Sequence, residues 1–270
     1  MENKDENKED PADKANEEKK DDSKEDKKDE KSKVSPREKE SETKVTPRKK
    51  EPKEEKAPDP DNEKKYKKHI FITARVHPGE TQASHMVHGM INFLMSDEPE
   101  AIEMRDKFII KIIPMLNPDG VIHGNYRVSF LGTDLNRRWK KPSKYLHPEI
   151  YHAKSIIKYF NVKSKMPGCD SGGVVMCCDL HGHSRNMDLF MYSCIEHDLI
   201  TNLIIRACPT AVDRQVPIFN FSTCKFAVEK DKENTARVVL FKELGILSAY
   251  TLESTFYGSE FLKRNKAGYG

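Results

Sequence analysis

Charged residues are so unevenly distributed along this 270-residue chain that only its later part can form a hydrophobic core. Residues 1–68 contain 22 Lys and Arg and 23 Asp and Glu, so that 45 of 68 positions are charged. Such a segment cannot bury enough apolar surface to offset backbone ordering, which costs roughly 1–2 kcal/mol per residue. We therefore expect residues 1–68 to be a disordered tail rich in Lys and Glu.

The remaining residues, 69–270, have the composition of an ordinary globular domain. They hold 25 of the 47 basic and 21 of the 44 acidic residues, a charged share of about one quarter. No run of 18 apolar residues occurs and the N-terminus lacks the apolar core of a signal peptide, so we expect neither a membrane span nor export. The net charge of +3 is small and mixed in sign, which argues against a nucleic-acid partner.

The cysteine pattern favours a reducing compartment. A disulfide-stapled scaffold is normally shorter and denser in cysteine than this chain, and no CxxC pair is present. Reduced thiols and a cytoplasmic location are therefore expected. The six cysteines are Cys169, Cys177, Cys178, Cys194, Cys208 and Cys224.

Apolar periodicity predicts strands alternating with helices over the later part of the chain. Strands are predicted over 70–76, 108–116, 174–180, 188–193 and 247–252, and helices over 81–94, 150–160 and 198–208. This order predicts an α/β domain with a mixed, largely parallel central sheet that has helices on both faces. Ligand sites in such sheets lie at the carboxyl ends of strands.

Two of these predicted strands end in candidate metal ligands, although His77 and Glu80 taken alone could belong to a surface turn. His77 and Glu80 follow the first strand three residues apart, and Asp179-Leu180-His181-Gly182-His183 follows the strand that starts at Val174. Two imidazoles and one carboxylate form the three-ligand set of a catalytic zinc site, which leaves a fourth position for water. His181 is preferred over His183 because it lies nearer the strand, although spacing alone leaves both open. His85 and His88 are better explained as ordinary helix histidines.

Other polar residues are consistent with hydrolytic chemistry, each with a simpler alternative. Arginines cluster at Arg127 and at Arg137-Arg138, and a guanidinium fork suits a carboxylate or a developing oxyanion, although solvated loop arginines explain the same residues. Glu253 lies at the end of an apolar strand, where a carboxylate is costly unless it is paired or used. It is either the general base of a hydrolase or a solvent-facing edge residue.

Taken together, these segments resemble the zinc carboxypeptidases, and most closely the cytosolic carboxypeptidase branch that removes glutamates from tubulin and other proteins. Six motifs carry the resemblance, in the family's order and at compatible spacings, and they span most of residues 70–260. They are HPGE (77–80), PMLNPDGV (114–121), GNYR (124–127), DLNRRW (134–139), DLHGHSR (179–185) and TLESTFYG (251–258).

The resemblance implies a catalytic centre with one zinc ion per chain. His77, Glu80 and His181 would be its ligands, and Glu253 would be the general base that takes a proton from water and returns it to the leaving amine. Asp134 would accept a hydrogen bond from His77 and so fix the tautomer of that ligand.

The resemblance also implies how the substrate is held. Asn136 and Arg137 would bind the terminal carboxylate, and Arg127 would face the carbonyl oxygen as negative charge develops there. Lys225 and Arg237 match basic positions near the side chain of the residue that is removed, where a cation favours Glu or Asp. Exposed charges on a loop and at a helix start are the alternative, which explains Lys225 about equally well.

The implied protein is a cytoplasmic metallocarboxypeptidase that removes C-terminal glutamates from acidic or polyglutamylated tails such as those of tubulin, with microtubule or cilium association. Neither nucleic acid nor a membrane is expected as a partner. Because members of this branch usually have further sequence on both sides of the catalytic domain, residues 69–270 are expected to be truncated at both flanks. Two alternatives are an inactive relative that binds acidic chain ends or tethers partners through its tail, and a zinc amidohydrolase, which the GNYR and DLNRRW segments disfavour.

Overall fold

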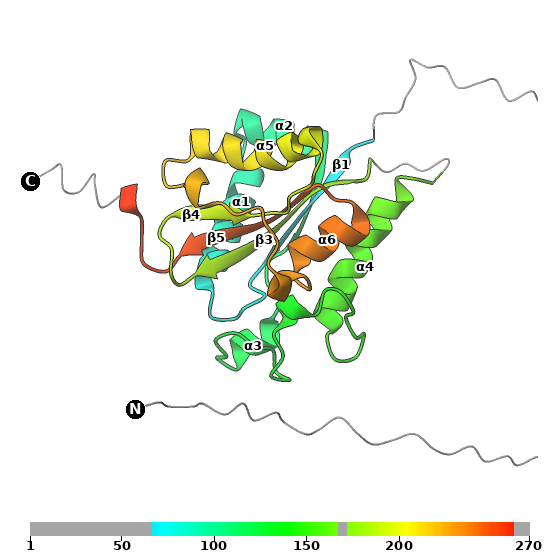
Figure 1. The fold of residues 1–270 in the computed structure, drawn as a ribbon, viewed down its shortest axis with the longest axis vertical. Helices are drawn as coiled ribbons and strands as arrows, with labels where there is room; N and C mark the ends of the chain where they lie inside the picture. Colours follow the sequence, from blue (N-terminus) through cyan, green and yellow to red (C-terminus); the bar gives the residue numbers. More distant parts are fainter. Residues whose placement is uncertain (1–65, 167–171, 262–270) are drawn as a thin grey trace, which may run out of the picture. The chain divides into compact units, whose positions relative to one another are not determined.

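A five-stranded sheet runs through the residues that the computed structural model describes, 66–166 and 172–261 (Figure 1). The strand order is β2-β1-β3-β5-β4, and only β4 is antiparallel to its neighbour. This confirms the mixed, largely parallel sheet. The strands are β1 (Lys68–Ala74), β2 (Phe108–Ile113), β3 (Val174–His183), β4 (Leu189–Tyr192) and β5 (Ser248–Thr255).

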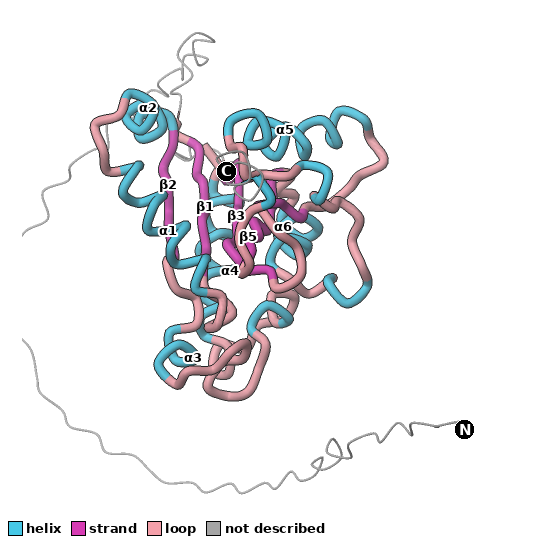
Figure 2. Tube along the Cα trace, turned by 90° about the vertical axis from the view of Figure 1, so that its left-hand side faces the viewer, coloured by secondary structure: helices cyan, strands magenta, loops and turns pink. Residues whose placement is uncertain are grey.

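Helices cover both faces of this sheet, as predicted. Figure 1 shows α1, α2 and α5 on one side and α4 and α6 on the other, and Figure 2 shows the sheet and its helices from another direction. The helices are α1 (Thr81–Leu94), α2 (Pro99–Lys107), α3 (Pro118–Ile122), α4 (Pro148–Lys163), α5 (Leu199–Gln215) and α6 (Ala236–Leu244), with short 3₁₀ turns η1 (Leu135–Arg137), η2 (Phe221–Thr223) and η3 (Lys230–Lys232). None of the helices in these segments has the length and apolar character needed to cross a membrane.

Strand alternation divides the buried side chains into two groups. Cys177 and Ala249 pack in the group that includes residues of α4 and α6, whereas their neighbours Cys178 and Tyr250 pack in the group that includes residues of α1. Consecutive side chains of a strand point to opposite faces. The polar residues that continue the first series, at the carboxyl ends of β3 and β5, therefore share one face.

Several strand boundaries differ from the prediction by two or three residues, for example β2, which ends at Ile113 rather than at residue 116, and two of the differences affect the site. β3 continues to His183 rather than ending at residue 180, and β5 continues to Thr255 rather than ending at residue 252. The apolar pattern stops earlier because polar side chains replace apolar ones there, but the backbone pairing continues, with His181 opposite Glu253. Both residues therefore lie within strands, not after them.

The tail and the thiols were further predictions. Residues 1–65 lie outside the described residues, so the predicted disorder of the tail stays a prediction. Cys169 lies outside as well. The other five cysteines are free thiols, as expected.

Candidate active site

The loop after β1 carries the first two candidate ligands. His77 lies in this loop and Glu80 immediately precedes α1. Gly79 donates its N–H to the carbonyl of Tyr126, and a Cβ on this glycine would lie 2.6 Å from the Tyr126 ring, so a side chain there would push the loop away. The guanidinium of Arg75 donates to the Pro78 carbonyl at 2.7 Å. The loop is therefore held at both of its sides.

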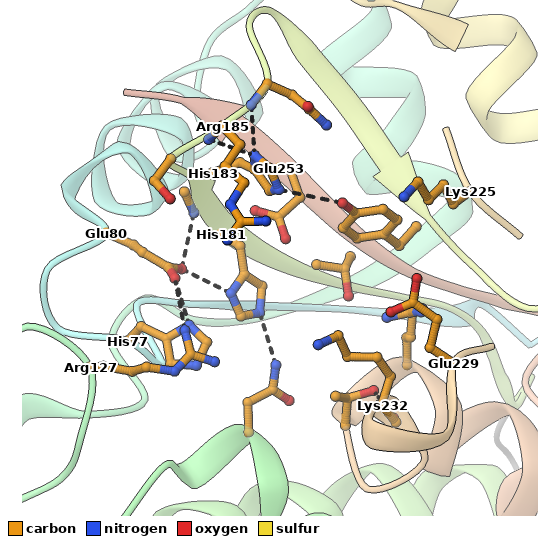
Figure 3. Close-up of a pocket in the computed structure, with 18 of the residues that line it drawn as sticks. His77, Glu80, Arg127, His181, His183, Arg185, Lys225, Glu229, Lys232 and Glu253 are labelled. Carbon is orange, nitrogen blue, oxygen red and sulfur yellow. Dashed lines mark hydrogen bonds and ion pairs between the residues drawn. The ribbon is translucent and has the colours of Figure 1, made fainter. Parts of the chain in front are cut away.

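The three predicted metal ligands meet at one point (Figure 3). The Nδ1 atom of His77 lies 2.6 Å from Glu80 Oε1, and the Nδ1 atom of His181 lies 2.9 Å from Glu80 Oε2. One candidate ligand atom from each residue lies within 4.8 Å of the other two, and all three residues are buried. His183 is not part of this group, because its Nδ1 accepts the N–H groups of Arg185 and Asn186. The structure thus selects His181 from the two histidines left open.

The donor set fits a zinc ion. The Nε2 atoms of His77 and His181 face carboxylates, those of Asp134 at 3.2 Å and Asp179 at 2.7 Å. An ionised carboxylate only accepts, so each imidazole can carry its hydrogen on Nε2 and present the Nδ1 lone pair to a metal. Burial alone would raise the pKa of Glu80, but His181 and His77 outweigh it and hold that pKa well below its ordinary value. Two imidazole nitrogens and one carboxylate match a catalytic zinc site.

Glu253 projects from β5 beside this cluster. Glu253 lies opposite His181 in the sheet register and is 8% exposed. Its Oε2 atom is buried and has no hydrogen-bond partner in the part of the chain that is described. Burial raises the pKa of this carboxyl to about 7. A carboxylate that exchanges protons near neutral pH suits general acid–base chemistry, because the ideal catalytic pKa lies near the working pH. The alternative of a solvent-facing Glu253 is therefore wrong.

Asp134 connects the metal cluster to the arginines. Its carboxylate accepts from the Nε of Arg127 at 3.0 Å and lies 2.8 Å from Arg127 Nη2. It also accepts the N–H of Asn136 and so begins the η1 turn. Burial alone would raise the pKa of Asp134, but the opposing effects of His77 and Arg127 are larger. The pKa of this carboxyl therefore lies well below its ordinary value. One carboxylate thus positions a ligand, an arginine and the DLNRRW segment.

These residues surround a single open cavity of about 690 Å³ at the carboxyl ends of β1, β3 and β5. Nine of the ten predicted site residues line it, and the tenth, Asp134, lies behind His77. The nine are His77, Glu80, Arg127, Asn136, Arg137, His181, Lys225, Arg237 and Glu253.

Comparison with known proteins agrees with this geometry. Residues 23–266 match the family model described as zinc carboxypeptidase. The chain belongs to the zinc carboxypeptidase family. It is 44% identical over 207 residues to cytosolic carboxypeptidase 1 of Mus musculus, a match that covers 72% of this chain and 16% of that protein. It is 46% identical over 196 residues to cytosolic carboxypeptidase 2 of Xenopus tropicalis, covering 72% and 19%. The chain thus spans less than a fifth of either relative.

A solved metallo-carboxypeptidase structure supports the fold independently. The metallo-carboxypeptidase from Burkholderia cenocepacia aligns with a TM-score of 0.60 at 28% sequence identity. The alignment covers 70% of this chain and 48% of that one.

The cavity wall formed by the start of α6 contains a buried arginine, Arg237. Arg237, at the start of α6, is 6% exposed, donates from Nε to the Ser193 carbonyl at 3.2 Å and lies over the Tyr192 ring. It forms no ion pair with any residue of the described segments. The alternative of an exposed helix-start charge is therefore wrong for Arg237, whereas Lys225 is exposed at the cavity wall.

Asn136 departs from the implied geometry, because protein groups already contact its amide. Its Oδ1 accepts the N–H of Ala236, and its Nδ2 lies 3.3 Å from His181 Nε2. The guanidinium of Arg137 is less engaged by protein groups than the Asn136 amide. Its Nη1 donates to the Asn136 carbonyl at 3.3 Å and lies 3.8 Å from Asp134 Oδ2.

Sequence reasoning did not assign a role to Asp179, although it is buried and contacts His181. The signal for it was the two-residue spacing within DLH, which places both side chains on one face of a strand.

Proposed function

We propose that this chain is a zinc-dependent metallocarboxypeptidase that removes C-terminal residues, glutamate above all, from acidic protein tails. One observation carries the proposal. One cavity holds the His77, Glu80 and His181 cluster, the Glu253 carboxylate and the Arg237 guanidinium. Among the residues that the structure describes, Glu253 Oε2 has no hydrogen-bond partner and Arg237 has no ion-pair partner. The first two groups serve hydrolysis, and the third attracts an acidic side chain.

His77, Glu80 and His181 would hold the metal. When bound, Zn²⁺ supplies Lewis-acid chemistry, which lowers the pKa of water and polarises a carbonyl oxygen. Glu253 takes a proton from the attacking water and later delivers it to the leaving amine, a role that its raised pKa suits. Arg127, held by the carboxylate of Asp134, faces the carbonyl oxygen and stabilises the negative charge that develops there.

Arg137, with Asn136 beside it, would bind the C-terminal carboxylate of the substrate and so restrict cleavage to the last residue. Arg137 lines the cavity and has the donors to bind a terminal carboxylate as a fork. Because the Asn136 amide already bonds to Ala236, Arg137 is expected to make the larger contribution.

The preference for acidic residues would come from Arg237, with Lys225 at the wall. A buried guanidinium without a carboxylate partner favours a substrate that supplies one and disfavours Lys or Arg at the same place. Proteins with acidic or polyglutamylated tails, such as tubulin, are the proposed substrates. We further propose a cytoplasmic location, supported by relatives named cytosolic carboxypeptidases. Microtubule or cilium association is part of the same proposal and would follow from tubulin being the substrate.

The test is a mass-spectrometric product profile of peptides that differ only in a terminal Glu, Ala or Lys, recorded with and without a chelator. We expect stepwise loss of terminal Glu, little loss of terminal Lys, and no cleavage with chelator.

Glu253→Gln should retain zinc and lose about 100-fold or more in turnover, because general acid–base groups contribute 10²–10⁴-fold. A zinc-loaded chain that binds acidic peptides without shortening them would instead support the inactive binder.

A further inference from the structure

The buried carboxylate of Asp179 contacts two side chains, those of the candidate ligand His181 and of Thr73. Asp179 is 3% exposed, its Oδ2 lies 2.7 Å from His181 Nε2, and its Oδ1 accepts the hydroxyl of Thr73 at 2.7 Å. The arrangement follows from the sheet. Asp179 and His181 are two residues apart on β3 and share a face, and Thr73 of β1 is the register partner of Asp179.

The imidazole of His181 has a second neighbour with the opposite preference. The Oδ1 of Asn136 accepts the N–H of Ala236, which turns the amide so that its Nδ2 lies 3.3 Å from His181 Nε2. An amide N–H donates, so Asn136 favours a bare Nε2 and places the imidazole hydrogen on Nδ1. That tautomer cannot bind a metal through Nδ1, the atom that faces Glu80.

Asp179 acts against this tautomer. Its ionised carboxylate has no hydrogen to donate, so its 2.7 Å contact requires a hydrogen on Nε2 and leaves the Nδ1 lone pair free. We propose that Asp179 is a positioning residue that holds His181 in its metal-binding tautomer against the competing amide of Asn136, with Thr73 fixing the carboxylate. The inference rests on the proposed zinc site and extends it to residues that do not touch the metal.

The two histidine ligands differ in how they are supported. Asp134, the carboxylate behind His77, also contacts Arg127 and the η1 turn, and its side chain is 20% exposed. Asp179 has two side-chain partners in the described segments, Thr73 and His181, and is more deeply buried. Solvent can therefore replace the support of His77 more easily than that of His181.

Little room exists for water to replace Asp179. The internal cavity beside it, which Thr73 and Arg237 also line, has a volume of about 10 Å³. A space of this size holds about one water molecule at most. Asp179→Asn, which keeps the side-chain volume, should therefore remove the charge without admitting a water, and leaves at most a neutral amide oxygen as the acceptor.

Zinc affinity of the full chain, measured by competition with a chromophoric chelator and without substrate, tests the proposal. We expect Asp179→Asn to weaken zinc binding about 10-fold and Asp179→Ala by up to about 100-fold, the range for residues that orient metal ligands. Adding Asn136→Ala to Asp179→Ala should recover part of the affinity, because the competing donor is gone. Thr73→Val keeps the contact between Asp179 and His181, so it should lose less than Asp179→Asn.

A spectroscopic readout separates positioning from packing. In the zinc-loaded chain, NMR should detect the Nε2 proton of His181 as protected from exchange, and Asp179→Asn should shift it to higher field. Wild-type zinc affinity in both Asp179 variants would overturn the proposal, as would a Thr73→Val loss equal to that of Asp179→Asn. Because no peptide is cleaved in these measurements, an inactive chain that shows the expected affinities would contradict only the proposed function.

Discussion

At the residue scale, Glu253 links catalysis to stability. Burial raises its pKa to about 7 in the folded chain, from an ordinary value of 4.5. A raised carboxyl pKa means that the folded state binds the proton more tightly than the unfolded state does. The contribution of this tighter proton binding to the free energy of unfolding is fully present below about pH 4.5 and is lost as the pH rises through 7.

Glu253→Gln removes this titration from the metal-free chain. Above pH 7 the wild-type carboxylate costs on the order of 3 kcal/mol, because each pKa unit corresponds to about 1.4 kcal/mol. The Gln variant should therefore unfold at higher denaturant concentration than the wild type at pH 8, and the gap should narrow toward pH 5. Chelator-treated protein in urea measures this, and a gap that does not depend on pH would contradict the burial of an ionisable Glu253.

Arg237 is the residue on which substrate preference depends. Arg237→Ala should lower kcat/KM for peptides ending in Glu by about 10- to 100-fold, because hydrogen bonds to charged groups contribute about 1.5–3 kcal/mol. Peptides ending in Ala should change much less. Arg206→Ala is the matched control, since that guanidinium lies over the Phe226 ring and does not line the cavity. An equal loss on both peptides would contradict a specificity role.

At the scale of elements, apolar periodicity predicted the sheet but not where β3 and β5 end. Leu180 and Leu252 close the apolar patterns, whereas backbone pairing continues past them through His181 and Glu253. Hydrogen-bonded strands need no apolar side chains, so periodicity fails where the site begins. α2 has no counterpart among the predicted elements because only Ala101 of its residues is buried.

Helix α5 shows a further limit of periodicity. Leu199, Leu203 and Ile204 share a face, yet they are 72%, 61% and 45% exposed, while Ile205 is fully buried. Which face of an amphipathic helix packs inward depends on its neighbours, which the sequence of the helix does not contain.

This difference within α5 gives a matched pair of variants. Ile205→Ala should destabilise the chain by about 2–5 kcal/mol, because it removes buried methyl groups and leaves a cavity. Leu203→Ala should change stability by less than about 0.5 kcal/mol, as expected for an exposed position. Urea unfolding of both variants measures the difference, and similar losses would show that α5 packs differently.

Eight of the ten predicted site residues, all but Lys225 and Arg237, lie in the six ordered motifs, but the contacts that these residues make could not be predicted. The contact of Thr73 with Asp179 depends on the register of β1 against β3, which brings residues 106 positions apart into hydrogen-bond contact. The engagement of Asn136 with Ala236 likewise depends on where α6 begins. Such pairings arise from tertiary packing and leave no local signal.

At the scale of the whole molecule, the metal cluster joins segments that are distant in sequence. His77 and Glu80 belong to the connection between β1 and α1, and His181 belongs to β3. A ligand that binds only the folded state stabilises it by about 2.7 kcal/mol at 100 times its dissociation constant. Zinc removal should therefore loosen the whole domain, not only the cavity.

Chelation of the full chain tests this coupling. Relative to zinc at 100 times its dissociation constant, the melting temperature should fall by about 5–10 °C, given shifts of 2–4 °C per kcal/mol for domains of this size. Readdition of zinc should restore both the melting temperature and peptide cleavage. His85→Ala, an exposed helix histidine outside the cluster, should respond to chelator as the wild type does. An unchanged melting temperature would contradict a zinc site that spans the fold.

The central claim, that three side chains from two segments bind one zinc ion, is tested most directly by anomalous X-ray scattering at the zinc edge. Crystals of the chain grown with zinc should show one anomalous peak per chain, in contact with Nδ1 of His77, Nδ1 of His181 and the carboxylate of Glu80. A peak elsewhere, or none in zinc-replete crystals, would contradict the account.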